Sequence, residues 1–309
     1  IYSTSLSIPV ISTTSFVVDW LERTKEPRVY QVFDSVCNLI NEFGEIISLV
    51  SKQIGSGPFS IIVDNPMESF QAFLGGKTRI SIIPGGLKLG EFILGTTDIP
   101  KWQSKIDVGK INIIFLKEII SDSFLEGLKP VISSTSLFST LDYSIFTDFT
   151  EGQININSRF KNRAKTFGRK LCEGILDDNN DLICTGTRGL AGLGGGLTPA
   201  GDDFILGVMF ANIMMFNENK SKRINSEIVI EASPLTTTLS ISWLISAAKG
   251  EFDMKWHDLF EAIKKQEIHH VYLGMKEIFT HGSTSGSDAI AGFISLLYFY
   301  FNHPNYSNN

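Results

Sequence analysis

Two glycine-containing segments in the C-terminal half carry residue types that could bind a small anion. The first runs from Gly186 to Gly207 (GTRGLAGLGGGLTPAGDDFILG), with six glycines between Gly189 and Gly201. So many glycines weaken a regular element, yet a helix-like apolar run follows directly from Phe204. A glycine loop that leads into a helix N-terminus presents free backbone N–H groups, which suit an anionic group.

The end of this segment predicts how the helix begins. We expect Thr198 to be the N-cap and Pro199 the first helical residue, because these positions favour Thr and Pro, respectively. Asp202 and Asp203 would then lie near the first helical turn, where negative charge is favourable.

The second segment, His281 to Phe293 (HGSTSGSDAIAGF), repeats the pattern [Ser/Thr]-x-x-Gly-x-Asp-x-x-x-Gly. The matching residues are Thr198, Gly201, Asp203 and Gly207 in the first segment and Ser283, Gly286, Asp288 and Gly292 in the second. In each copy the Asp and the last Gly are four residues apart and share a helix face, where the Gly admits another backbone. We therefore expect the two turns to meet and to line one pocket.

Ordinary helix capping is the alternative interpretation. Ser, Thr and Asp before an apolar run are common capping residues, and this explains the second segment as well as binding does. The glycine content of the first segment favours binding. A third polar patch, Thr236 to Ser240 (TTTLS), opens a predicted helix and would either cap it or add donors to the same pocket.

The elements that must position these segments divide the chain into a β-rich region, residues 1–150, and a helical region, residues 151–309. The fold class is therefore α+β, with a sandwich or barrel of mostly antiparallel strands in the first region. Short Val-, Ile- and Phe-rich runs predict strands at 28–39, 46–51, 59–63, 79–83, 91–95 and 111–116. The first run could instead form a helix over 28–40. Helical spacing follows from 155 onward, then at 234–249, 256–265 and 268–279.

Composition limits the functional classes. The 309 residues have a net charge of −6, which argues against a general nucleic-acid or anionic-membrane partner. Three cysteines without a CxxC motif fit a reducing compartment better than a disulfide framework. The longest apolar runs, 204–216 and 289–301, are shorter than the roughly 20 residues of a membrane span and predict buried helices. The N-terminus does not have the pattern of a signal peptide.

The run GLGGGLTPAGDDF resembles the signature GLGPGLTPSGDD of the AllH family of bacterial proteins, long grouped as a domain of unknown function and loosely called carboxylases. TTTLS at 236–240, GSTSGSD at 282–288 and GPFSI at 57–61 are similar to, or compatible with, other parts of that family. The sequence departs from the signature at Gly195, where Pro is expected, and at Ala200, where Ser is expected.

The resemblance implies a cytoplasmic protein associated with ureide (allantoin) breakdown. It also implies a subunit of an oxamate carbamoyltransferase, which cleaves oxalurate with phosphate into oxamate and carbamoyl phosphate. The implied partners are one subunit similar to acyl-CoA synthetases and another of a separate family. The resemblance assigns no catalytic residues.

Carbamoyl transfer to phosphate requires two positioned anions and a stabilised oxyanion. The predicted phosphate ligands are the loop amides, at Gly192, Gly194, Gly195 and Gly196. Arg188 would pair a carboxylate or phosphate unless it is only solvated, and His281 would be an acid or base unless it is only packed.

The side chains of the two turns complete the predicted site. Thr198 and Ser285 would donate to a carbonyl, and Asp202 or Asp203 would accept from a carbamoyl NH₂ or hold Mg²⁺. No other cofactor or metal site is predicted. The remaining candidates are Asp288 as a catalytic residue and Gly201, Thr237, Ser240, Ser283, Thr284 and Gly286 as ligand-binding residues.

Two other functions stay open. GLAGLGGG before an apolar helix faintly resembles the phosphate loop of small-molecule kinases of the GHMP type, although Leu-Thr-Pro intervenes. A regulatory or scaffold subunit that senses a small anion without catalysis is the other. HExxH, GxSxG and Walker A motifs are missing from the sequence.

Overall fold

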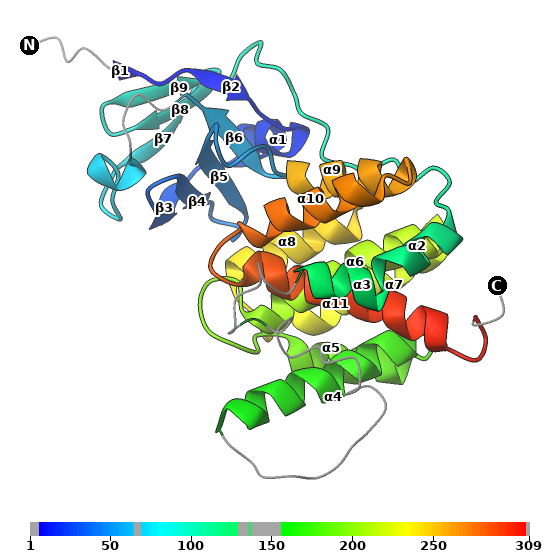
Figure 1. The fold of residues 1–309 in the computed structure, drawn as a ribbon. Helices are drawn as coiled ribbons and strands as arrows, with labels where there is room; N and C mark the ends of the chain where they lie inside the picture. The colour runs from blue at the N-terminus through cyan, green and yellow to red at the C-terminus, as the bar shows by residue number, and fades with distance from the viewer. Residues whose placement is uncertain (1–5, 65–68, 129–135, 137–155, 307–309) are drawn as a thin grey trace, which may run out of the picture. The chain divides into compact units, whose positions relative to one another are not determined.

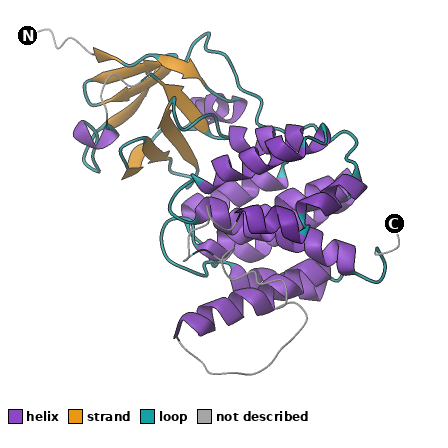
Figure 2. Cartoon of the chain, in the orientation of Figure 1, coloured by secondary structure: helices purple, strands orange, loops and turns teal. Residues whose placement is uncertain are grey.

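The computed structural model describes residues 6–64, 69–128, 136 and 156–306, apart from the side chains of 156–159. Strands occupy the N-terminal part and helices most of the rest, so the predicted α+β class is confirmed (Figures 1 and 2). The chain forms two compact units, Ile1–Lys105 with Glu251–Met254, and Ile106–Gly250 with Lys255–Asn309. The predicted domain boundary at residue 150 lies outside the described residues and stays a prediction.

The first unit contains two sheets. The five-stranded sheet has the order β2-β6-β5-β4-β3 and the four-stranded sheet the order β1-β9-β8-β7. The strands of the first are β2 (Val10–Ser12), β3 (Arg28–Val32), β4 (Val36–Ile40), β5 (Ile46–Ser51) and β6 (Ser60–Val63). Those of the second are β1 (Leu6–Ser7), β7 (Ile80–Ile83), β8 (Gly86–Leu89) and β9 (Phe92–Gly95). Only β5–β6 and β1–β9 are parallel among the described pairs, so the expected antiparallel character is confirmed.

Both sheets and helix α1 (Ser15–Arg23) contribute to one hydrophobic core. Cys37 and Leu49 are opposite each other in the β4–β5 register, as are Leu39 and Ile47, and all four side chains are buried. The second sheet adds Leu87, Leu89 and Leu94, and α1 adds Val17 and Trp20. The period-2 pattern of these strands thus supplies the apolar face that makes the unit fold.

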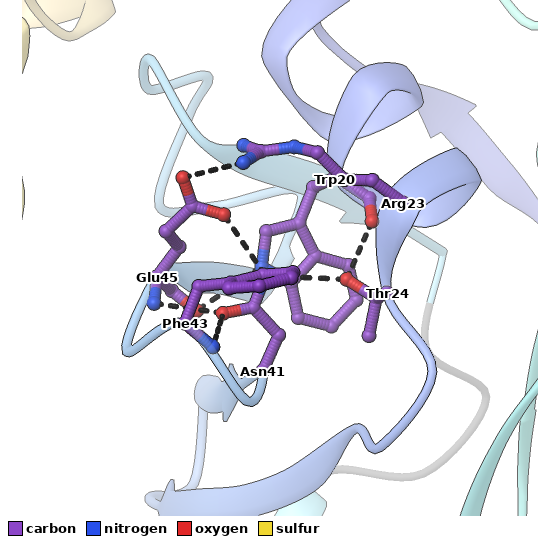
Figure 3. Close-up of polar contacts among 6 residues, drawn as sticks. All are labelled: Trp20, Arg23, Thr24, Asn41, Phe43 and Glu45. Carbon is purple, nitrogen blue, oxygen red and sulfur yellow. Dashed lines mark hydrogen bonds and ion pairs between the residues drawn. The ribbon is translucent and has the colours of Figure 1, made fainter.

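The turn between β4 and β5 is tied to α1 by polar contacts (Figure 3). The Asn41 carboxamide oxygen accepts from the backbone N–H groups of Phe43 and Glu45, at 3.0 and 2.9 Å. The Trp20 indole N–H donates to the Glu45 carbonyl at 3.0 Å, and Arg23 forms an ion pair with the Glu45 carboxylate. The buried indole therefore has a partner for its one polar atom, as burial requires.

Two expectations for the first 150 residues were wrong in detail. The run 28–39 is neither one strand nor a helix but the two strands β3 and β4, joined by a turn. The run 111–116 is not a strand, because α2 (Ile113–Ile119) begins there. Its N-cap, Asn112, accepts from the amides of Ile114 and Phe115, which outweighs the β propensity of the short isoleucine-rich run. Helix α3 (Asp122–Leu128) follows.

The remaining helices are α4 (Ile156–Leu176), α5 (Asn180–Leu190), α6 (Ala200–Met215), α7 (Glu218–Ala232), α8 (Thr238–Ala248), α9 (Met254–Lys264), α10 (Ile268–Phe279) and α11 (Ser285–Asn302). They confirm the helices predicted from 155 onward and near 234–249, 256–265 and 268–279. Helices α6 and α11 contain the two longest apolar runs, and most of their residues are buried, also as predicted. No described helix has the length and hydropathy needed to cross a membrane.

Candidate functional site at two helix-entry turns

The two repeated segments begin α6 and α11, and these helices cross through reciprocal glycine contacts. A Cβ on Gly207 of α6 would lie 1.7 Å from the carbonyl oxygen of Ala289 in α11. A Cβ on Gly292 of α11 would lie 1.9 Å from the carbonyl oxygen of Phe204 in α6. Ala289 and Phe204 each follow the aspartate of their own segment, so the crossing relates the two segments by an approximate two-fold axis.

The first glycine of each pattern has an equivalent packing role. A Cβ on Gly201 would lie 2.1 Å from the Leu190 carbonyl oxygen at the end of α5, and one on Gly286 would lie 1.8 Å from the Ile278 carbonyl oxygen in α10. The amides of both glycines already donate to backbone carbonyls, that of Gly201 to Leu193 and that of Gly286 to His281. These two predicted ligand-binding residues therefore serve the approach of helix to helix.

The first turn is held at both ends by hydrogen bonds. Asp202 accepts from the Gly192 amide at 2.9 Å and from the Thr236 hydroxyl, so each of its carboxylate oxygens has a donor. The hydroxyls of Thr237 and Ser240 both donate to the Leu197 carbonyl. Of the two roles considered for the polar patch before α8, capping is confirmed, because Thr237 accepts from the Ser240 amide. The donation of hydroxyls to a ligand pocket stays a prediction.

Between the hydrogen-bonded residues Gly192 and Leu197, the loop backbone is exposed to solvent. Gly194, Gly195 and Gly196 are exposed, and the amides from Gly194 to Thr198 donate to no acceptor among the described residues. Gly194 and Gly196 have φ of +119° and +92°, which favours glycine, whereas Gly195 does not have positive φ. A Cβ on Gly195 would meet nothing within 4 Å. Five consecutive free N–H groups on a clamped loop form a concentrated set of donors for an oxoanion.

A hydroxyl pair joins the two turns. The Thr198 Oγ1 and Ser285 Oγ atoms are 2.9 Å apart and hydrogen-bonded, across 87 positions of sequence. The expectation that the turns meet is therefore confirmed. Ser283 is exposed and Thr284 partly exposed beside Ser285, so hydroxyl groups dominate this edge of the second turn.

The two patterned aspartates are buried at the crossing. Asp203 is 7% exposed and Asp288 is fully buried, and Asp203 Oδ2 has no hydrogen-bond partner among the described residues. Burial raises the pKa of Asp203 well above its ordinary value, and the nearby Asp288 and Asp202 carboxyls raise it further. The Ser285 and Thr198 hydroxyls offset this only in part. Burial also raises the pKa of Asp202, against the effect of its hydrogen bonds.

The predicted start of α6 was wrong by one residue. Pro199 is the N-cap and Ala200 the first helical residue, because Pro199 has an extended ψ of 144°. Thr198 therefore lies before the cap, and its hydroxyl bonds Ser285 instead of an α6 amide. Thr284 is the N-cap of α11, and neither helix has a side-chain cap hydrogen bond. Ordinary capping does not account for the hydroxyls at these two helix starts.

Two predicted residues have other partners. Arg188, in the last turn of α5, forms an ion pair with Glu231 of α7. His281 is half-buried at the second turn, where its ring lies edge-on to Trp243 of α8 with centroids 6.4 Å apart. The charge of Arg188 is therefore already neutralised by Glu231.

The aspartates do not form a preorganised metal site. Both Asp202 oxygens have donors, and the ligand atoms of Asp202, Asp203 and Asp288 do not all lie within 4.8 Å of one another. Among the described residues, Cys184, Glu227 and Glu231 do meet that spacing, but Glu231 also pairs with Arg188. The Cys184 thiol donates to Glu227, and burial raises the pKa of this thiol to about 11.

Arg163 was missed by the sequence reasoning. Its Nε donates to the Gly189 carbonyl at 3.1 Å, at the end of α5 and three residues before Gly192. The helical run from 155 onward is rich in Lys and Arg, but spacing within one helix does not show which basic side chain reaches a neighbouring helix.

Comparison with known proteins assigns the chain to a family. The AllH family model, described as oxamate carbamoyltransferase subunit AllH, matches residues 190–297, and the AllH family N-terminal domain matches residues 7–99. The chain belongs to the AllH family. The first match contains both helix-entry turns. No curated protein and no solved structure matches the chain.

Proposed function

We propose that this chain is the subunit of an oxamate carbamoyltransferase that binds the small anionic substrate between its two helix-entry turns. The observation that carries the proposal is the run of five free amides from Gly194 to Thr198, beside a hydroxyl pair and a buried carboxyl. Membership of a family described as an oxamate carbamoyltransferase subunit supports the reaction class. Other subunits of the complex are the expected partners.

The loop amides would bind the oxoanion, which is phosphate, the phosphate of carbamoyl phosphate, or the carboxylate of oxamate. Hydrogen bonds from backbone N–H to a charged acceptor are stronger than neutral ones and need no side chain. Asp202 takes no part in this contact, since its two oxygens hold Gly192 and Thr236. It is a positioning residue, which fixes the start of the loop.

The hydroxyls of Thr198 and Ser285 would contact the carbamoyl group. In the direction that forms carbamoyl phosphate, a phosphate oxygen attacks the carbamoyl carbon and the C–N bond to the oxamate nitrogen breaks. That nitrogen gains a proton as it leaves, and phosphate loses one. Hydroxyl donors at the carbonyl oxygen stabilise the charge that develops there. Because one hydroxyl of the pair donates to the other, one hydroxyl proton would be left to face the substrate when Asp203 is neutral.

A charge placed on the loop tests the proposal directly. Gly195→Asp puts a carboxylate beside the free amides, at a position where a Cβ meets no neighbour and φ is not positive. We expect the variant to bind oxamate, phosphate and carbamoyl phosphate at least about tenfold more weakly, while Gly195→Asn, of nearly equal size, binds almost as the parent does. Isothermal titration calorimetry with each ligand measures this effect.

A thermal-shift series on the unchanged chain sets the baseline. A ligand at 100 times its dissociation constant adds about 2.7 kcal/mol of stability. Stabilisation by oxamate, oxalurate, phosphate or carbamoyl phosphate supports the proposal. Stabilisation by ATP with Mg²⁺ alone would favour the kinase alternative, and equal binding by Gly195→Asp and Gly195→Asn would remove the loop from the site.

A further inference from the structure

An anion at the first turn faces an unfavourable local charge. Asp202 lies in the first turn of α6, and both of its carboxylate oxygens accept hydrogen bonds. This carboxylate already occupies the positive end of the α6 dipole, so that end has less attraction left for a second anion. Five amides supply hydrogen bonds but no net charge. A cation near the loop is therefore needed to bind an oxoanion tightly.

Arg188, the cation chosen from sequence, is paired with Glu231. Arg163 of α4 is the alternative, because its Nε donates to the Gly189 carbonyl and its guanidinium lies over the Phe167 ring, 5.6 Å from the centroid. A Cβ on Gly189 would touch that same ring, so Arg163, Phe167 and the end of α5 form one stack.

These contacts orient the Arg163 guanidinium but leave most of its N–H groups without an acceptor among the described residues. No ion pair involves Arg163 among the described residues, and its only hydrogen bond there is the one from Nε to Gly189. Four N–H groups on Nη1 and Nη2 are thus available in a fixed planar arrangement. The side chain is exposed, so a ligand can reach these groups.

We propose that Arg163 is a specificity-determining residue that pairs with the oxoanion bound by the loop amides. This role rests on the proposed function, and Arg163 would supply the positive charge that the loop amides lack. A planar fork with two free amino groups matches the two oxygens of a carboxylate or two oxygens of a phosphate. The chemistry is common to both, so the ligand series decides whether oxamate or phosphate makes the contact.

A structural role makes a different prediction. A cation at the C-terminal end of α5 stabilises the helix by its dipole and by bonding a terminal carbonyl. In that case removal of Arg163 lowers the melting temperature but leaves ligand affinity unchanged. Affinity and melting temperature are therefore measured on the same variants.

The test compares Arg163→Gln, Arg163→Lys and the control Arg169→Gln in the full chain, by calorimetric titration with oxamate and with inorganic phosphate. Arg169 lies on the same helix but pairs with Glu173 at 2.6 Å. We expect Arg163→Gln to lower the affinity for the ligand that Arg163 contacts at least about tenfold. Arg163→Lys should lower this affinity less, and Arg169→Gln should leave it unchanged. The lysine variant keeps the charge and guards against a folding artefact.

The outcomes separate the two proposals. If Gly195→Asp abolishes binding but Arg163→Gln binds like the parent, the function stands and the role of Arg163 is overturned. An equal loss of affinity in Arg163→Gln and Arg169→Gln would also overturn it, because the loss would then reflect the overall positive charge of α4 and not a contact made by Arg163. If the parent chain binds none of oxamate, oxalurate, phosphate and carbamoyl phosphate, both proposals fail.

Discussion

The two helix-entry turns share their packing and differ in their chemistry. Both place glycines at the α6–α11 crossing and at the end of the preceding helix. Between helices, however, the first turn has nine residues (191–199) and the second has five (280–284). The extra length of the first turn contains the free amides, whereas the second turn offers hydroxyls. The repeated glycines therefore encode the crossing, and anion binding is proposed for the loop amides that the copies do not share.

A basic side chain bonds a carbonyl near the end of each helix that precedes a turn, α5 and α10, but the two side chains differ in their free donors. Arg163 donates to Gly189 near the end of α5, and Lys255 donates to Glu277 near the end of α10 and to the Thr280 hydroxyl. Both groups satisfy terminal carbonyls, as helix ends require. Only the guanidinium has a planar fork with donors to spare for a bidentate ligand.

The largest effect is expected where the turns are most alike. Gly207→Ala and Gly292→Ala should each lower the free energy of unfolding by about 3 kcal/mol, because the added Cβ would overlap a backbone oxygen and force the helices apart. Urea unfolding of each variant measures the loss. Gly195→Ala, whose Cβ meets nothing within 4 Å, is the control and should stay within about 0.5 kcal/mol of the parent. A tolerated change at either crossing glycine would disprove the two-fold relation.

The glycines that follow the ends of α5 and α10, Gly192 and Gly282, should differ in the stability that an alanine substitution costs. Gly192 has φ of +68° and its Cβ would lie 2.2 Å from the Leu235 carbonyl oxygen, whereas Gly282 has φ of +63° and its Cβ would lie 3.3 Å from the Ser285 hydroxyl. Gly192→Ala should cost about 2 kcal/mol, from backbone strain plus overlap, and Gly282→Ala about 1 kcal/mol from strain alone. Equal losses of unfolding free energy in urea would show that the close approach of the Leu235 carbonyl to Gly192 adds no cost to the substitution.

The sequence was most informative where a pattern is local. The apolar period of the strands, the helix spacing after residue 155 and the burial of α6 and α11 were predictable because each depends on neighbouring residues. The meeting of the turns was predictable from the repeated Asp and Gly positions. The strand predicted at 111–116 failed because one capping residue, Asn112, changed the preference of a short apolar run.

Partners between distant helices could not be predicted. Arg188 and Arg163 look alike in the sequence, since neither has an acidic residue three or four positions away. Their difference arises from Glu231 on α7, which neutralises one, and from Phe167 and Gly189, which hold the other. Such choices depend on which helix faces meet, and a single sequence does not contain that information.

The buried carboxyl at the crossing predicts a pH dependence. The pKa of Asp203 is raised in the folded chain, so the native state holds a proton that the unfolded state releases near pH 4. Stability therefore falls as pH rises from about 4 through the folded pKa. Asp203→Asn should flatten this slope and raise stability at pH 7, while weakening substrate binding. Thermal melts from pH 4 to 8 measure the slope, and a residual slope from Asp202, whose pKa is also raised, is expected. A steeper slope in the variant would contradict the assignment.

The smallest effect concerns the hydrogen bond between Thr198 and Ser285, which joins the turns. Thr198→Val and Ser285→Ala each remove one hydroxyl of the pair, and in a double-mutant cycle the coupling energy should be about 1 kcal/mol. Urea unfolding of the parent, both single variants and the double variant gives this value. If the hydroxyls also contact the carbamoyl group, the single variants should lose affinity for carbamoyl phosphate more than for phosphate, since only the former has a carbonyl. Parallel losses for both ligands would place the hydroxyls at the oxoanion instead, and a coupling of zero would mean that the turns are held together by their glycines alone.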